Sequence, residues 1–96
     1  MPATLRRFWF EFNLPPIGVA QPDAWRYLRL GCGVTGYDEA DCRRLLESHL
    51  LGTDPWPEET AVISDVDVRT LDGGHVLPNM EPPNVRGIWF PRGFQT

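Results

Sequence analysis

Only one segment of this chain has the periodicity of a helix, and the runs on either side of it have the periodicity of strands. Residues 39–51 place a set of side chains on one helical face, namely Cys42, Leu45, Leu46, His49 and Leu50. Asp38 precedes the segment as a helix-capping residue, and Gly52 follows it as a stop signal. One helix can cover only one face of a sheet. The second face of any sheet in this protein therefore needs a separate explanation.

Four runs are typical of strands. Residues 5–12 alternate aromatic and polar side chains with a period of two, and residues 25–34 form the second run. Residues 60–68 and 85–90 are rich in β-branched and aromatic residues. The order strand, strand, helix, strand, strand predicts an α+β fold in one globular domain over residues 1–96. We expect a four-stranded mixed sheet with the helix packed on one face, because a right-handed crossover would make the second and third strands parallel.

The charged residues restrict the possible functions. Nine basic residues against thirteen acidic ones give a net charge of −4, and every basic residue is an arginine. Without lysine there is no Schiff-base or phosphate-loop lysine. An acidic domain without a basic run is also a poor nonspecific binder of nucleic acid.

The lengths of the apolar runs and the spacing of the cysteines indicate in which compartment of the cell such a protein is expected. No apolar run has the length of a membrane span, and no signal-type apolar region follows Arg6 and Arg7. The two cysteines lack the spacing of a metal site and are both expected in the core between sheet and helix. The sequence therefore predicts a cytoplasmic protein with no membrane partner, no bound metal and no cofactor.

The sheet face away from the helix is expected to carry three of the four tryptophans together with charges of both signs. Alternation places nine residues there: Arg7, Trp9, Glu11, Trp25, Tyr27, Arg29, Asp65, Asp67 and Trp89. In one interpretation the 69–84 loop folds over this face, with arginines stacked on the rings. In the other, the face binds a protein partner or a second copy, since tryptophan, tyrosine and arginine are enriched at interface hot spots. The binding residues would then be Arg7, Trp9, Trp25, Tyr27, Arg29 and Trp89.

Residues 64–90 hold a dense group of short polar side chains between two expected strands. The pair Gly73-Gly74 permits positive φ, and three prolines lower the entropy of the unfolded chain. We expect an ordered loop in which Asp72 bonds backbone amides near Gly74, while His75 or Asn79 anchors the loop to the sheet. Ordered long loops in compact domains tend to be functional.

Four residues of this region are the candidates for catalysis or metal binding: Asp65, Asp67, Asp72 and His75. Paired carboxylates with a histidine can hold Mg²⁺ or Mn²⁺, or act as acid and base. Arg7 and Arg29 are expected on the same face, where they would neutralise the acids, and Asp72-Gly73-Gly74 is itself a turn sequence. A small metal-dependent or acid/base enzyme is the alternative function that these residues support.

Gly31, Gly33 and Gly36 form a G-x-G-x-x-G pattern after an expected strand and before the expected helix. This is the context of a dinucleotide-binding fingerprint. However, the chain is too short for the doubly wound sheet that carries the fingerprint, and acidic residues crowd the helix start where a pyrophosphate needs positive potential. We interpret the glycines as permitting a bulge and a tight turn between strand and helix.

The tail motifs DVDVRTLD, HVLPNM and RGIWFP resemble those of a family of small uncharacterised bacterial proteins, and the resemblance implies no activity. The sequence predicts a non-enzymatic protein-binding domain of an accessory, antitoxin or immunity type, which uses the aromatic and arginine face together with the 69–84 loop. A small acidic binder can occlude a basic site on its partner. A single-strand nucleic-acid binder that stacks bases on Trp9, Tyr27 and Trp89 ranks third, because the net charge opposes it.

Overall fold

Four strands form one sheet in the computed structural model, which describes residues 4–94. The strands are β1 (Arg6–Asn13), β2 (Cys32–Gly36), β3 (Glu58–Ser64) and β4 (Gly87–Phe90), in the spatial order β3-β1-β2-β4. The helix α1 (Glu39–Leu46) runs directly into a π-helical segment, η2 (Glu47–Leu51). The predicted α+β class is confirmed. Residues 1–3 and 95–96, which belong to the predicted domain, lie outside the described residues.

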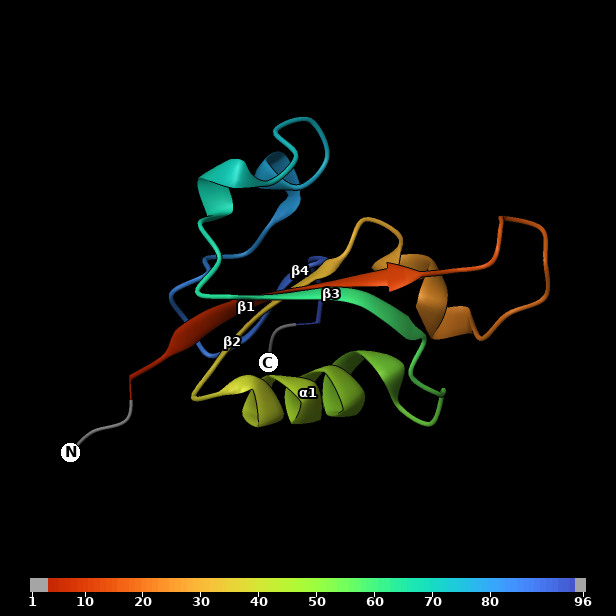
Figure 1. The fold of residues 1–96 in the computed structure, drawn as a ribbon, viewed down its shortest axis with the longest axis horizontal. Helices are drawn as coiled ribbons and strands as arrows, with labels where there is room; N and C mark the ends of the chain where they lie inside the picture. Colours follow the sequence, from red (N-terminus) through yellow and green to blue (C-terminus); the bar gives the residue numbers. More distant parts are fainter. Residues whose placement is uncertain (1–3, 95–96) are drawn as a thin grey trace.

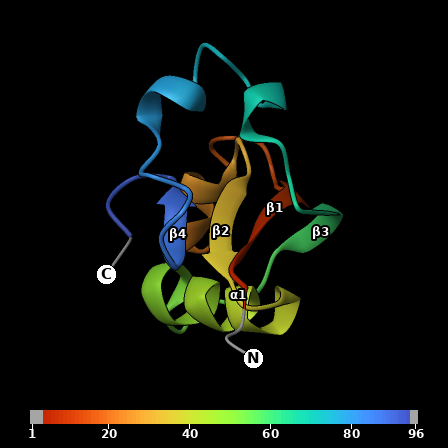
Figure 2. The same ribbon diagram turned by 90° about the vertical axis from the view of Figure 1, so that its left-hand side faces the viewer.

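The sheet is antiparallel, whereas the sequence predicted a mixed sheet. β1 pairs antiparallel with β2 and with β3, and β2 pairs antiparallel with β4. β2 and β3 therefore run in the same direction, as a crossover through the helix requires, but β1 lies between them (Figure 2). The prediction was wrong about the neighbours because the alternation of residues along a strand carries no information about which other strand lies beside it.

The helix begins and ends where its sequence signals predict. The Asp38 side chain accepts a hydrogen bond from the Asp41 amide at 2.7 Å, and Gly52 ends the π-helical segment with φ of 62°. α1 covers one face of the sheet (Figure 1), and both cysteines are buried there as predicted. No helix within residues 4–94 is long and apolar enough to cross a membrane. The core on this face contains Phe8, Phe10, Leu28, Val34, Leu46 and Ile88.

The first part of the second predicted strand is a 3₁₀ helix. Residues Asp23–Leu28 form this helix, η1, and the strand begins only at Cys32. The Trp25 amide donates to the Pro22 carbonyl, and Gly31 has a φ of 109° that turns the chain into β2. The apolar residues of this run alternate as in a strand, and this pattern led to the wrong prediction. Leu28 belongs to the 3₁₀ helix and packs into the core from there.

The other face of the sheet is covered by the chain between β3 and β4. This segment contains two short 3₁₀ helices, η3 (Val68–Thr70) and η4 (Leu77–Asn79), and lies on the side opposite α1 (Figure 1). Trp9 and Trp89 are 2% and 0% exposed, with ring centroids 5.9 Å apart. The expectation that these two rings are exposed is therefore wrong, and the alternative in which the loop covers them is correct. The buried residues of this second core are Trp9, Val66, Val76, Trp89 and Phe90.

Hydrogen bonds fasten the covering segment in a pattern that was predicted in part. The Asp72 carboxylate accepts from the Gly74 amide at 2.7 Å, as expected. The Asn79 side chain donates to the His75 carbonyl within the loop, so this pair does not anchor the loop to the sheet. Backbone bonds tie the segment to the sheet instead, from the Glu81 amide to the carbonyl of Trp89 in β4 at 2.7 Å and from the Val66 amide to the carbonyl of Arg7 in β1 at 3.2 Å. A hydrogen bond between main-chain atoms cannot be predicted from the identity of the side chains.

The glycines of the G-x-G-x-x-G pattern serve close packing. A Cβ on Gly33 would lie 2.4 Å from the Trp89 ring, and one on Gly31 would lie 2.4 Å from the Trp9 ring. The pairing of β2 with β4 also shifts register between Gly33 and Val34, where a bulge was predicted, and the residue left without a partner is Trp89 of β4. The space that a nucleotide would need above Gly33 is filled by a tryptophan.

Candidate functional site

The strand that was expected to present two carboxylates ends before them. β3 stops at Ser64, and Asp65 turns the chain with φ of 53°. The Asp65 carboxylate accepts from Nε and Nη2 of Arg6, at 3.0 and 2.9 Å. The Asp67 carboxylate accepts from the same two atoms of Arg69, at 3.0 and 2.8 Å. The hydrogen bonds from Arg6 lower the pKa of Asp65, and those from Arg69 lower the pKa of Asp67 to about 2. Each acid is thus an ionised member of an arginine pair.

Asp72 and His75 form a separate pair on the outside of the covering segment. Oδ2 of Asp72 and Nδ1 of His75 are 3.1 Å apart, and both side chains are at least half exposed. The backbone hydrogen bond from Gly74 is the main reason that the pKa of Asp72 is lowered. Across residues 4–94, no cluster of three or more His, Cys, Asp or Glu side chains is arranged to hold a metal ion. The four predicted residues therefore do not converge on one centre.

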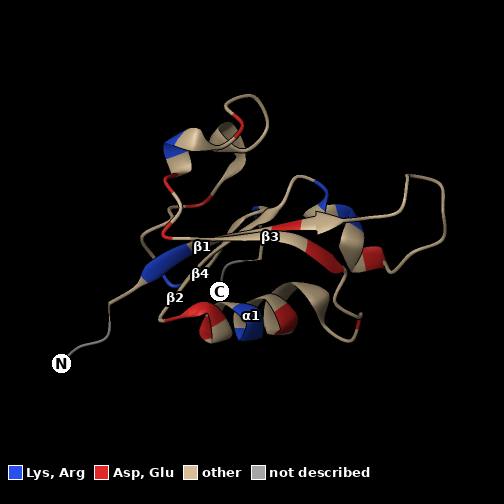
Figure 3. Cartoon of the chain, in the orientation of Figure 1, with Lys and Arg blue, Asp and Glu red and all other residues tan. Residues whose placement is uncertain are grey.

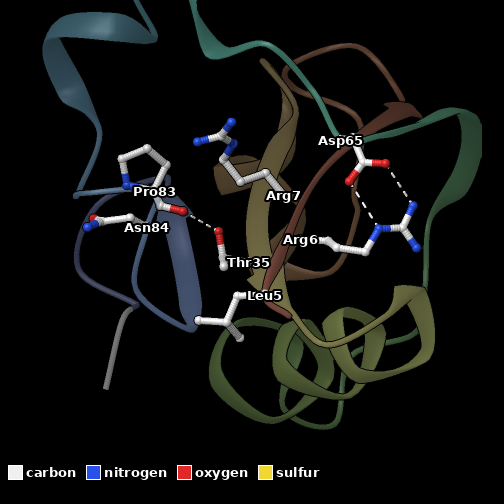
Figure 4. Close-up of a pocket in the computed structure, with 7 residues that line it drawn as sticks. All are labelled: Leu5, Arg6, Arg7, Thr35, Asp65, Pro83 and Asn84. Carbon is white, nitrogen blue, oxygen red and sulfur yellow. Dashed lines mark hydrogen bonds and ion pairs between the residues drawn. The ribbon is translucent and has the colours of Figure 1, made fainter. Parts of the chain in front are cut away.

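A hollow of about 240 Å³ lies where the start of β1 meets the segment before β4 (Figure 4). We call it the arginine hollow, and its lining residues are Leu5, Arg6, Arg7, Thr35, Asp65, Pro83 and Asn84. The Thr35 hydroxyl, almost fully buried, donates to the Pro83 carbonyl at 2.5 Å and so joins the covering segment to β2. Arg6 is fixed by Asp65 and lies over the Phe8 ring at 5.1 Å.

Arg7 is the side chain of the arginine hollow that has no fixed partner. It is exposed, and within residues 4–94 it forms no side-chain hydrogen bond or ion pair. Two arginines and one aspartate line the hollow, so its lining carries one net positive charge (Figure 3 shows the charged residues along the chain). Such a site can receive an anion, and arginine suits a planar carboxylate because it presents paired N–H donors.

A second hollow, of about 210 Å³, lies at the far end of the sheet beside the chain that leaves β1. This chain, residues 14–22, is named the 14–22 loop. Nη2 of Arg29 donates to the Pro15 carbonyl at 2.8 Å and to Oε1 of Gln21 at 3.0 Å. Nε2 of Gln21 donates in turn to the Val19 carbonyl at 3.1 Å. The lining residues are Ile17, Gly18, Gln21, Pro22, Asp23, Arg26 and Arg29.

Apolar and cationic groups stand side by side at this second hollow. Ile17 is 86% exposed and Val19 is 52% exposed. Arg26 stacks over the Tyr27 ring at 4.9 Å, and Nη2 of Arg26 donates to the Tyr27 hydroxyl at 2.9 Å. Within residues 4–94, neither Arg26 nor Arg29 is paired with a carboxylate. The charges of these two guanidinium groups are therefore available to a partner.

The six residues predicted to form one binding face are distributed over three places. Trp9 and Trp89 belong to the second core, and Arg7 lines the arginine hollow. Trp25 is half-buried and donates through Nε1 to the Pro55 carbonyl. Tyr27 lies with Trp25 in η1, and Arg29 follows at the end of that helix and lines the second hollow. The lining residues that sequence reasoning missed include Ile17, Gln21, Arg26 and Asn84, although the Pro-Pro-Ile-Gly stretch does signal a turn that would expose an isoleucine.

The buried thiols are unsuited to nucleophilic chemistry. Cys32 and Cys42 are both 0% exposed and free. Burial raises the pKa of both groups, that of Cys42 to about 12. Because the thiolate is the reactive form, these cysteines act as small apolar core residues.

Comparison with known proteins finds no family model, no curated protein and no solved structure with significant similarity to this chain.

Proposed function

We propose that this chain is a non-enzymatic protein-binding domain that docks through the 14–22 loop and the adjoining η1. The observation that carries the proposal is Ile17, which is 86% exposed at the tip of a loop with a defined conformation. A single exposed apolar residue is ordinary. Here Ile17 lines a hollow, and Val19, two residues further along the loop, is also exposed.

The loop is prepared for binding before a partner arrives. Pro15 and Pro16 restrict the backbone ahead of Ile17, and the bonds of Arg29 and Gln21 hold the loop on both sides. The Val19 amide also closes a turn onto the Pro16 carbonyl at 3.1 Å. A segment already held in its bound conformation loses less entropy on association, so more of the contact energy contributes to affinity.

The charges beside the loop indicate the chemistry of the partner. Arg26 and Arg29 line the same hollow as Ile17 and have no carboxylate partner in the described chain, and together with Asp23 they give the lining one net positive charge. A complementary segment therefore carries an apolar side chain with aspartate or glutamate next to it. Complementary charges of this kind raise the association rate and select the partner, while the apolar contact supplies affinity.

A selection from random peptides tests this function without knowledge of the partner. Peptides displayed on phage are selected on the wild-type protein, and the sequences recovered are expected to combine an apolar residue with neighbouring acids. Ile17→Ser is expected to weaken their binding by about 30-fold, because truncation of a central anchor costs about 2 kcal/mol. The dissociation constants are measured by isothermal titration calorimetry.

Ile63→Ser is the matched control, since Ile63 is also exposed, at 43%, but belongs to β3. It is expected to leave the affinities unchanged. Circular dichroism of both variants shows that they keep the fold. Ligands that bind Ile17→Ser as tightly as the wild type would contradict the proposed docking site.

A further inference from the structure

We infer that the arginine hollow is a binding site for a single carboxylate group, separate from the proposed docking loop. The carboxylate would contact Arg7, with Arg6 and Asn84 as neighbouring walls (Figure 4). The same chemistry is offered by a small carboxylic acid and by the carboxyl group of a peptide, and the experiment below distinguishes these two sources.

The free charge of the hollow results from how Asp65 is oriented. Both carboxylate oxygens of Asp65 are bound by Arg6, at 3.0 and 2.9 Å, so that pair is internally neutral. Asp65 reaches this geometry with φ of 53°, a conformation that few residues other than glycine, asparagine and aspartate adopt readily. Arg7 comes directly after Arg6 in the chain and forms no hydrogen bond or ion pair with an anion in residues 4–94, although its charge helps to lower the pKa values of Asp65 and Asp67. The lining of the hollow therefore carries one net positive charge.

The opposite wall is held in place by contacts that do not involve Arg7. Thr35 is 1% exposed, and its hydroxyl bonds the Pro83 carbonyl. Pro83 is thereby tied to β2, and the exposed Asn84 follows it directly. A ligand would enter a recess whose two sides are already joined, so binding requires little reorganisation of the backbone.

Size and charge select a monocarboxylate over larger or more highly charged anions. The hollow, at about 240 Å³, lies below the range of about 300 to 1,000 Å³ that is usual for drug-sized ligands. It suits a carboxyl group on a short carbon chain. One net positive charge balances one carboxylate, whereas a phosphate dianion would keep one charge uncompensated.

Nuclear magnetic resonance titration of the ¹⁵N-labelled full chain tests the inference. The probes are propionate, acetyl-dialanine with a free carboxyl group, acetyl-dialanine amide, and inorganic phosphate, at constant ionic strength. We expect the two carboxylates to shift the signals of Arg7, Thr35 and Asn84, with dissociation constants on the order of 1 mM. The amide is expected to cause no shift. Tighter binding of acetyl-dialanine than of propionate identifies a peptide carboxyl group as the source, and the reverse order identifies a small acid.

Arg7→Gln keeps the polarity of the side chain while removing its charge. We expect it to weaken carboxylate binding about tenfold or more, the loss of one charge-assisted contact. Arg44→Gln, which removes the same charge from a side chain on α1 that is 67% exposed, is expected to have no such effect. Ile17→Ser is also expected to bind carboxylates normally, so failure of the docking proposal and failure of this one are distinguishable.

Three results would overturn the inference. The first is the absence of carboxylate-induced shifts at Arg7, Thr35 and Asn84. The second is equal weakening by Arg7→Gln and Arg44→Gln, which would show general attraction between charges. The third is tighter binding of phosphate than of either carboxylate, which would contradict the match of one charge to one charge.

Discussion

Gly33 shows how a single residue without a side chain decides the packing of the second core. The ring of Trp89 lies where a Cβ on Gly33 would stand, 2.4 Å from its nearest ring atoms. Trp89 is fully buried, and its indole N–H is the one buried side-chain donor or acceptor in residues 4–94 without a hydrogen-bond partner. The apolar contacts of the ring with Trp9 and the covering segment therefore stabilise it in the core, since the unpaired indole N–H opposes its burial.

Gly33→Ala is expected to destabilise the fold by about 2 kcal/mol, because the added methyl group overpacks a site closed by a buried ring. Urea denaturation followed by tryptophan fluorescence measures the free energy of unfolding. Gly73→Ala is the matched control: a methyl group added at Gly73 would have no other group within 4 Å, so its effect is expected within about 0.5 kcal/mol. Equal effects of the two substitutions would show that Trp89 does not depend on the missing Cβ.

At the scale of elements, Asp41 connects α1 to the end of β2 and to the start of β4. This residue follows the helix cap, and its side chain is 5% exposed. Its carboxylate accepts from the Tyr37 amide at 3.0 Å, after β2, and from Nε of Arg86 at 2.9 Å, just before β4. The hydrogen bonds from Arg86 are the main reason that the pKa of Asp41 is lowered from 3.8 to about 2.

This shift predicts how the contribution of Asp41 depends on pH. The folded state holds the carboxylate more strongly as an anion, so the stabilisation is complete above the ordinary pKa of 3.8 and is lost as pH falls toward about 2. Asp41→Asn is expected to cost about 2 kcal/mol near neutral pH. The difference from wild type should shrink to near zero at the acid end of a series of urea titrations. A gap that stays constant across this range would contradict the prediction.

At the scale of the whole molecule, one sheet separates two cores of different construction. The larger core lies under α1 and η2, and the smaller one lies under a segment with only two short 3₁₀ helices. The smaller core depends on a few apolar side chains, on backbone bonds from Glu81 to β4 and from Val66 to β1, and on the bond from the Thr35 hydroxyl to Pro83. Regions of this kind can open separately from the rest of a domain.

Hydrogen exchange is expected to show the covering segment closed but less protected than the central strands. The amides of Val76 and Leu77 both donate to the Asp72 carbonyl at 3.0 Å, so both should exchange slowly. Val76→Ala should cost about 2 kcal/mol and speed the exchange of Leu77 more than that of β1. Val85→Ala, at a residue that is 48% exposed, should leave both rates unchanged. Rapid exchange of Val76 and Leu77 in the wild type would show that the segment is not anchored.

The sequence by itself determined the features that depend on neighbours along the chain. The cap at Asp38, the helical face with Cys42 and the turn from Asp72 to Gly74 all follow from local spacing and hydrogen bonding, and all are present. The sequence also predicted that a loop could cover the tryptophan face, but composition alone did not decide between a covered face and a binding face.

Tertiary structure decided what depends on residues far apart in the chain. β1 lies between β2 and β3, and Asp65 pairs with Arg6, which is 59 positions away in the chain. The Trp89 ring packs directly against Gly33. Alternation along a strand states which residues share a face and not what covers that face. A charged side chain likewise carries no sign of the residue with which it will pair. Arg7 was therefore recognisable from the sequence as a candidate for binding, while its unpaired state in the arginine hollow emerged only after its neighbours were placed.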